Sequence, residues 1–420
     1  MITTISVLPG ITLRCFSDNR FKQGCLSIQF LRPASAEEAA MNALIPAVLL
    51  RGCQSAPDLR HITLRLDDLY GASIGALVRR IGDYQTTGLY CGFISDRYTM
   101  DGDTVLAPMI SFLEEILLHP VLDDGVFRQD YVESEKKNLI AAIQSQKNDK
   151  RAYCVNQLLR TMCKNDPFGI PRLGEAAWVE DVRPDALYAH YQKVLRESRV
   201  ELFYVGEAAP EQVAEHLKSL FGSVDRSYVN LPEQSDFHDS GKEALTETME
   251  IAQGKLAMGF VTPITLRDPR LAAMQVCNTI LGAGMTSKLF MNIREKQSLC
   301  YDIGSGYYGS KGILTVNAGI DWDKEKLVRT EIENQLAACK DGQISQEELC
   351  SAKESLCSAL LGTHDSPGAI EGYYESGALS GHFITPDAYI GKIQAVTAED
   401  CARAAQTLRC HSSFFLKGDA

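Results

Sequence analysis

The two halves of this chain repeat the same order of expected strands and helices, and this repetition constrains the fold more than any other feature. Alternating or β-branched apolar runs indicate strands, and apolar residues at helical spacing indicate helices. In the first half these patterns predict, in order, strands at 11–16 and 25–31, helices at 35–50 and 58–69, strands at 73–80 and 85–94, and helices at 104–118 and 125–145. To complete the first half, these patterns predict further helical segments up to residue 195, a strand at 200–205 and a helix at 210–221. In the second half they predict, in order, a strand at 255–261, a helix at 271–281, strands at 300–308 and 313–320, and helices at 324–339 and 346–361. A period of roughly 220 residues is too long for a solenoid array and indicates a duplicated domain.

A polar segment separates the two repeats. Residues 226–242 include Pro232, Gly241 and a number of serine, asparagine and aspartate residues, a composition typical of linkers. The 420 residues also exceed what one hydrophobic core usually supports. We therefore expect a first lobe at residues 1–225, a linker at residues 226–242 and a second lobe at residues 243–420.

The order of elements within each repeat predicts the fold class. Strands occur in pairs followed by more than one helix, whereas a doubly wound parallel fold would alternate one strand with one helix. We expect an α+β fold of two homologous lobes, each with a mainly antiparallel sheet covered by helices.

The overall composition excludes two classes of partner. Hydrophobic residues make up 45% and charged residues 23% of the chain, as in ordinary globular proteins. The formal net charge of -12 argues against nucleic acid, because phosphate backbones are bound by surplus lysine and arginine. The amino terminus has no basic region ahead of a long apolar run, and no apolar stretch reaches the ~20 residues of a spanning helix. We therefore expect a cytoplasmic protein with no membrane partner.

The cysteines give no metal or disulfide pattern. All 13 are scattered along the chain without a C-x-x-C motif, which indicates free thiols. Cys350 and Cys357 lie on one expected helix and can share a face. Because two thiols without a nearby histidine make a poor metal site, we expect this pair to pack in the core.

A segment of the second half carries a family resemblance. Residues 281–290 read LGAGMTSKLF and residues 293–301 read IREKQSLCY. They resemble the pattern L-G-G-G-x-S-S-R-L-F followed by L-R-E-K-x-G-L-x-Y of the pitrilysin/insulinase family of zinc metallopeptidases, which includes the mitochondrial processing peptidases. In that family the arginine and tyrosine reach a peptide substrate beside the zinc, so the resemblance implies this substrate-binding role for Arg294 and Tyr301. The alternative is that Arg294 lies in a solvated Arg-Glu-Lys run and Tyr301 packs in a strand.

The zinc-binding residues of this family are missing. Its inverted motif H-x-x-E-H supplies two histidine ligands and a glutamate that activates water, and the typical run HFLEHMLFKGT aligns with ALIPAVLLRGC at residues 43–53. The histidines are replaced by Ala43 and Ala47, and the glutamate by Pro46. The family's later E-x-x-x-x-x-x-E motif aligns with residues 135–142, where the glutamate ligand is replaced by Ala142. None of the eight histidines lies in another zinc-peptidase motif.

The resemblance therefore implies a two-lobed clamshell of the pitrilysin/insulinase type, from an inactive bacterial member of the family. It predicts no catalytic residue and no cofactor in this chain, with zinc expected only in an active partner. The metal positions are lost, whereas Arg294 and Tyr301 are retained. This combination favours a non-catalytic subunit of a peptidase, which would form a heterodimer with a homologue that keeps the zinc motif. Its ligand would be an unfolded peptide, bound as an added strand at a sheet edge. The negative net charge favours basic peptides.

Two alternatives belong to other functional classes. One is a structural or scaffolding protein with no role in proteolysis, like the core proteins of respiratory complexes that share this fold. The other is a peptide-binding chaperone that works as a homodimer. Cleavage in the presence of a zinc-motif homologue, or binding of peptides without metal, would separate these possibilities.

Overall fold

The computed structural model describes residues 2–100 and 102–418, which form two compact units. Unit 1 comprises Met1–Gln144, Ile170–Gln234 and His364–Ser376, and unit 2 comprises Ser145–Gly169, Ser235–Thr363 and Gly377–Ala420. Both units therefore contain segments from both halves of the sequence. Residues 225–243, which include the expected linker, contain no helix or strand. The limits predicted for the lobes and the linker stay predictions.

Unit 1 is built on a six-stranded sheet with the strand order β1-β2-β8-β3-β5-β4. Its strands are β1 (Ile2–Leu8), β2 (Ile11–Ser17), β3 (Gln23–Pro33), β4 (Ser73–Ile81), β5 (Tyr84–Ile94) and β8 (Arg199–Gly206). Neighbouring strands are antiparallel except β2 and β8, which are parallel. β4 forms one edge of this sheet, and the edge is part of the candidate site.

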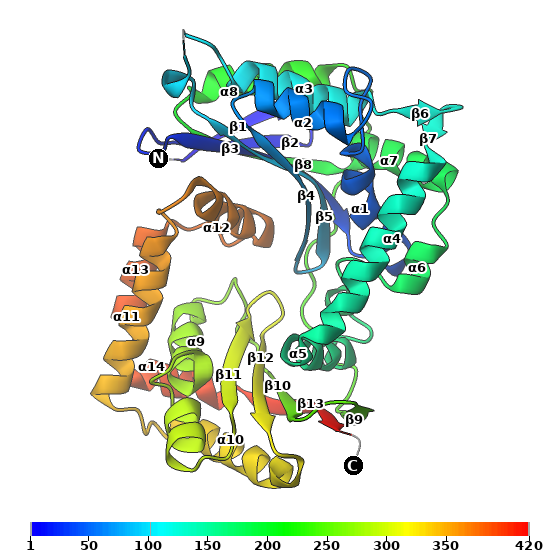
Figure 1. Ribbon diagram of the computed structural model, residues 1–420. Helices are drawn as coiled ribbons and strands as arrows, with labels where there is room; N and C mark the ends of the chain where they lie inside the picture. Colours follow the sequence, from blue (N-terminus) through cyan, green and yellow to red (C-terminus); the bar gives the residue numbers. More distant parts are fainter. Residues whose placement is uncertain (1, 101, 419–420) are drawn as a thin grey trace. The chain divides into compact units, whose positions relative to one another are not determined.

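Helices pack with this sheet around a continuous apolar core (Figure 1). The helices of unit 1 are α1 (Ala36–Leu49), α2 (Leu59–Asp68), α3 (Leu106–Leu118), α4 (Gln129–Ser145), α6 (Ala176–Glu180), α7 (Pro184–Glu197) and α8 (Pro210–Gly222). Apolar residues recur at helical spacing in α3, where Met109, Ile110, Leu113 and Ile116 are buried. The core is thus formed by the residues whose periodicity predicted the helices.

Unit 2 is built on a five-stranded sheet with the order β11-β12-β10-β13-β9. Its strands are β9 (Ala244–Met249), β10 (Gly254–Val261), β11 (Asp302–Tyr308), β12 (Ile313–Ile320) and β13 (Arg409–Gly418), and only β13 and β9 are parallel among the described pairs. Its helices are α5 (Lys150–Met162), α9 (Leu271–Asn278), α10 (Glu325–Lys340), α11 (Gln346–Gly362), α13 (Pro386–Ala395) and α14 (Ala398–Gln406). α12 (Pro367–Ser380) begins in unit 1 and ends in unit 2.

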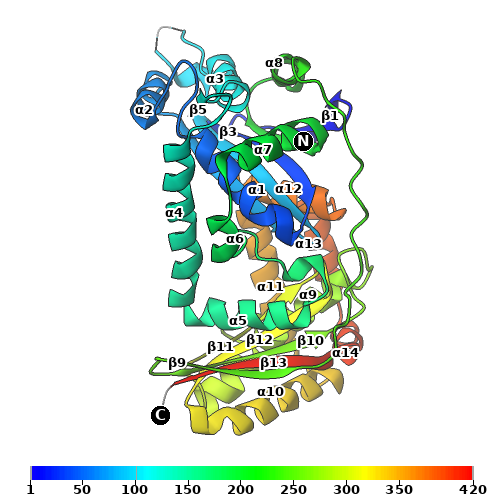
Figure 2. The same cartoon turned by 90° about the vertical axis from the view of Figure 1, so that its right-hand side faces the viewer.

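Both faces of the sheet of unit 2 are covered. One face packs against a core that includes α9, α10 and α14, and the other packs against α5. Figure 2 shows α5 and α10 on opposite sides of this sheet. The predicted fold class, α+β with two largely antiparallel sheets packed with helices, is confirmed.

The prediction about the thiol pair is wrong for one of its two members. All 13 cysteines are free; Cys357 is half-buried and packs against the core of unit 2, whereas Cys350 is exposed. In α11 the fully buried positions are Leu349 and Ala352. Cys350 follows Leu349 by one residue and is rotated about 100° around the helix axis, which turns it towards solvent.

No helix in the described part of the chain combines the length and apolar character needed to cross a membrane.

Candidate functional site

The degenerate motif lies on α1, and a proline inside this helix shapes it. Ser35 caps the amino terminus, because its Oγ accepts a hydrogen bond from the Glu38 N–H at 3.2 Å. Pro46 has no N–H, so it cannot donate to the carbonyl of Asn42, four residues earlier. The Thr87 hydroxyl on β5 donates to that carbonyl instead, at 2.6 Å. A neighbouring strand thus supplies the hydrogen bond that the helix cannot make.

Two of the four positions that the family resemblance predicts to be degenerate metal positions face one cavity. Ala43 of α1 and Ala142 of α4 both line an open cavity of about 770 Å³, together with β4 and Leu139. Pro46 instead lines a small interior void of about 10 Å³. Ala47 is half-buried. The structure therefore brings Ala43 and Ala142 to the same wall, although they are far apart in sequence.

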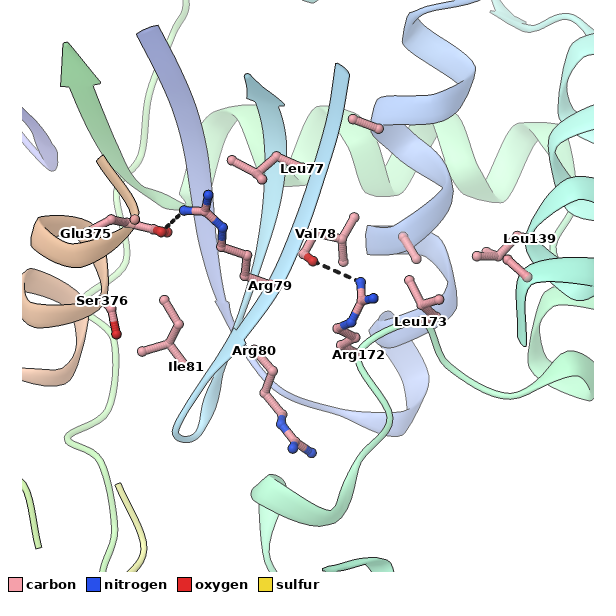
Figure 3. Close-up of a pocket in the computed structure, with 14 residues that line it drawn as sticks. Leu77, Val78, Arg79, Arg80, Ile81, Leu139, Arg172, Leu173, Glu375 and Ser376 are labelled. Atoms are coloured by element: carbon pink, nitrogen blue, oxygen red, sulfur yellow. Dashed lines mark hydrogen bonds and ion pairs between the residues drawn. The ribbon is translucent and has the colours of Figure 1, made fainter. Parts of the chain in front are cut away.

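The cavity runs along the free edge of β4 (Figure 3). All residues from Ala76 to Ile81 line it, so it contacts both faces of the strand, because successive side chains point to opposite faces. The Val78 carbonyl accepts a hydrogen bond from Arg172 Nη1 at 3.2 Å, so this carbonyl points away from β5. By the alternation of an antiparallel pair, the backbone groups of Ala76 and Arg80 also point to the open edge.

A buried ion cluster anchors the start of α12 to one face of the sheet. Arg79 donates to both carboxylate oxygens of Glu371, at 3.1 and 2.9 Å, and forms an ion pair with Glu375. The Ser27 hydroxyl also donates to Glu371, at 2.6 Å. Both glutamate side chains are 1% exposed. Because removing one member would leave a buried charge uncompensated, this cluster holds the α12 wall of the cavity in place.

The other two predicted site residues lie in unit 2, where Tyr301 is exposed and Arg294 is partly exposed. Arg294 belongs to a π-helical segment, Leu289–Lys296, and its guanidinium lies 4.6 Å from the centre of the Phe290 ring. Tyr301 precedes β11, and its hydroxyl donates to Asp321 Oδ1 at 3.0 Å. This hydrogen bond raises the pKa of Tyr301 above its ordinary value, since the neighbouring carboxylate disfavours the phenolate. Both side chains are accessible to a ligand.

Comparison with known proteins identifies the family. Residues 181–356 match the peptidase M16 inactive domain. The chain is 31% identical over 411 residues to the probable inactive metalloprotease YmfF of Bacillus subtilis, which covers 97% of this chain and 96% of that protein. The chain belongs to the M16 family, the pitrilysin/insulinase family. The predicted family is confirmed.

The likeness to solved structures extends over the whole chain. A conserved protein from Enterococcus faecalis V583 superimposes with a TM-score of 0.92 at 28% identity, covering 100% of this chain and 99% of that one. A chain of complex III2 from Candida albicans superimposes with a TM-score of 0.75 at 16% identity, covering 100% and 95%. The second likeness shows a shared fold alone.

The zinc of the pitrilysin/insulinase family does not fit the residues present here. Ala43, Pro46, Ala47 and Ala142 offer no side-chain lone pair to a metal. In the described residues, no group of three or more histidine, cysteine, aspartate or glutamate side chains could hold a metal ion. Nearby polar groups are engaged elsewhere. Glu135, the retained glutamate of the second motif, pairs with Arg51 at 3.2 Å, and His190 Nε2 lies 2.8 Å from Asn42 Oδ1.

Burial keeps His190 neutral. It lowers the pKa of this histidine to about 4, because the charged imidazolium is poorly solvated inside unit 1. The neutral ring carries its proton on Nε2 and donates to the Asn42 amide oxygen. His190 thus supports α1 rather than acting as a metal ligand.

Sequence reasoning did not identify Arg79, Arg172, Glu371 or Glu375 as site residues. Each is an ordinary charged residue in its own segment, and its partner lies far along the chain. Arg79 and Glu371 are separated by 292 residues. No local spacing signals such a pair, so only the folded chain reveals the cluster.

Proposed function

We propose that this chain is a non-catalytic, metal-free member of the pitrilysin/insulinase family that binds extended peptides. Paired with a homologue that keeps the zinc motif, it would complete that homologue's substrate site. The observation that carries the proposal is the cavity of unit 1. Ala43 and Ala142, at two positions where the family pattern has metal ligands, line an open space beside a free strand edge.

A strand edge of this kind suits a peptide without demanding a particular sequence. The outward backbone groups of β4 can pair with an extended peptide, and main-chain hydrogen bonds then provide affinity. The adjoining wall is partly apolar, with Leu77, Leu139 and Leu173 available to contact alternate side chains. The proposal therefore places the bound peptide as an additional strand beside β4.

The roles proposed for Arg294 and Tyr301 rest on their chemistry and exposure. A guanidinium and a phenol can each donate a hydrogen bond to a peptide carbonyl that gains negative charge during cleavage. Because this chain has no metal ligands at the degenerate metal positions, Arg294 and Tyr301 would bind a substrate held at the zinc of a partner. These roles therefore require a heterodimer with a zinc-motif homologue.

The decisive experiment combines the purified chain with a zinc-motif homologue and measures peptide cleavage by each protein alone and by the mixture. We expect cleavage by the mixture to exceed the sum of the separate rates. We expect Arg294→Ala and Tyr301→Phe to lower the activity of the mixture at least tenfold, the loss of about one transition-state hydrogen bond. Arg409→Ala and Tyr98→Phe, which change exposed residues outside both candidate sites, should have no effect. Full activity with both Arg294→Ala and Tyr301→Phe would contradict the shared site.

A structural role is the second candidate, and the likeness to a chain of complex III2 favours it. In a structural role, the chain would provide a surface on which other proteins assemble. The chain would then bind no peptide in isolation and would not stimulate any zinc-motif homologue, while co-purifying with other proteins in a fixed stoichiometry.

A further inference from the structure

We infer that Arg172 makes the cavity of unit 1 selective for peptides that carry a carboxylate next to the residue paired with Val78. In this inference Arg172 leaves the Val78 carbonyl when the peptide binds and pairs with that carboxylate. The inference rests on the proposed function, because it specifies which extended peptides the β4 edge accepts. It reverses the preference for basic peptides that the net charge of the whole chain indicates.

The backbone of Arg172 is fixed, whereas its side chain lies at the surface. Gln85 Nε2 donates to the Arg172 carbonyl at 2.7 Å and to the Ala39 carbonyl at 3.0 Å. The amide oxygen of Gln85 accepts from Asn42 Nδ2 at 2.9 Å. These buried hydrogen bonds tie the loop before α6 to β5 and α1. The exposed guanidinium of Arg172 can therefore move without moving the loop.

The charge of the cavity wall is positive. Arg79, Arg80 and Arg172 line the cavity, and Glu375 is the one acidic residue among its described lining residues. Glu375, together with Glu371, is already paired with Arg79. The carboxylates paired with Arg79 are thus engaged, and the described lining offers no other carboxylate to Arg172.

The contacts of Arg172 leave most of its donors available. A guanidinium has five N–H donors, and one nitrogen of Arg172 donates to the Val78 carbonyl. Within residues 2–100 and 102–418, no carboxylate forms an ion pair with Arg172. In Figure 3 its side chain extends from the loop to β4 across the cavity wall. It is the cation best placed to meet an incoming peptide.

The hydrogen bond to Val78 is also an obstacle to strand addition. An added strand donates its own N–H groups to outward carbonyls of the edge, and Arg172 occupies one of them. The guanidinium must then turn to water or to another acceptor. A carboxylate on the peptide offers a bidentate partner that matches the fork of the guanidinium. A peptide without a carboxylate displaces Arg172 without this compensation.

The test uses the full chain and a short fluorescent peptide of alternating threonine and valine with blocked ends. Versions with glutamate, glutamine or lysine at the central position are compared by fluorescence anisotropy. A fourth version carries glutamine and a free carboxyl terminus, which distinguishes a terminal carboxylate from a side-chain carboxylate. We expect the glutamate peptide to bind about three- to tenfold more tightly than the glutamine peptide, the range for a solvent-accessible charged pair. The lysine peptide should bind no better than the glutamine peptide.

The variants separate this inference from the proposed function. In Arg172→Ala the ratio between the affinities for the glutamate and glutamine peptides should fall to about one, and the glutamine peptide should bind more tightly than to the wild type because Val78 is uncovered. Arg60→Ala, an exposed arginine on α2 outside the cavity, should keep the wild-type ratio. Equal binding of both peptides to the wild type, or an unchanged ratio in Arg172→Ala, would overturn the inference and leave peptide binding intact. Failure of every peptide to bind would refute the proposed function itself.

Discussion

Replacing Thr87 with valine should destabilise unit 1, because the Thr87 hydroxyl satisfies a carbonyl that Pro46 leaves without a helical partner. The acceptor is the Asn42 carbonyl, and the hydrogen bond is 2.6 Å long. Asn42 is fully buried and Thr87 is 1% exposed, so water cannot replace the lost donor. A buried acceptor left unsatisfied costs about 1 to 3 kcal/mol. Valine is close in shape to threonine, so most of this cost should come from the hydroxyl.

A double-mutant cycle isolates this cause. Pro46→Ala restores an N–H at the position that donates to the Asn42 carbonyl in a regular helix. In that background Thr87→Val should cost only about 0.5 to 1 kcal/mol, since the carbonyl keeps one hydrogen bond. The coupling energy between the two positions should therefore be about 1 to 2 kcal/mol.

The two tryptophans of the chain provide the assay. Trp178 packs against the core of unit 1, whereas Trp322 lies in unit 2 and is 41% exposed. In a Trp322→Phe background, the fluorescence of Trp178 reports unfolding of unit 1 by urea, so the free energy refers to one unit rather than to the whole chain. An equal cost of Thr87→Val with and without Pro46 would refute the reasoning.

Three further predictions concern other features of the chain. Burial lowers the pKa of His190 from 6.5 to about 4, so the contribution of this residue to the free energy of unfolding should be fully present above pH 6.5 and should fall by up to about 3 kcal/mol as the pH drops towards 4. Urea unfolding at a series of pH values should show this decrease, and His190→Gln should remove it. The triple substitution Ala43→His, Ala47→His and Ala142→Glu restores the ligand set of the family, so it should bind zinc at one equivalent per chain by elemental analysis; no binding would show that these positions are misaligned with the family's ligands. Ellman's reagent should modify the two exposed thiols, Cys350 and Cys410, first in the native protein, and replacing both with serine should remove the fast phase.

The regular elements of the fold could be predicted because their signals are local. The strand pair β4 and β5 and the helix α3 follow directly from β-branched residues and helical spacing. β1, β9 and β13 were not among the predicted strands. β1 and β9 are edge strands, β1 mostly half-buried and β9 largely exposed, so they lack the buried apolar pattern that marks an inner strand. The parallel pairs β2 with β8 and β9 with β13 join distant segments, and no local pattern specifies such a pairing.

The candidate site was predictable only in part, for a related reason. Ala43 and Ala142 were found through the family resemblance, and both line one cavity. No resemblance pointed to Arg172, whose importance depends on a hydrogen bond to a strand 94 residues away. Cys350 was misplaced because helical spacing shows that two residues share a face but does not show which face is buried.

The missing metal site and the positive cavity are consistent with each other electrostatically. In the family pattern, the glutamate ligand and the catalytic glutamate carry two negative charges that balance the two positive charges of zinc. When proline and alanine replace these two glutamates, as at Pro46 and Ala142, and the metal is lost as well, the net charge of the site does not change. Loss of the metal alone would leave the carboxylates unpaired, at a considerable cost in free energy. The charge of the remaining wall is then set by arginine side chains, of which Arg79 is matched by Glu371 and Glu375. A zinc ion polarises a peptide carbonyl, but a guanidinium recognises a carboxylate by its planar fork. The proposed site should therefore recognise a peptide through a carboxylate that the peptide carries.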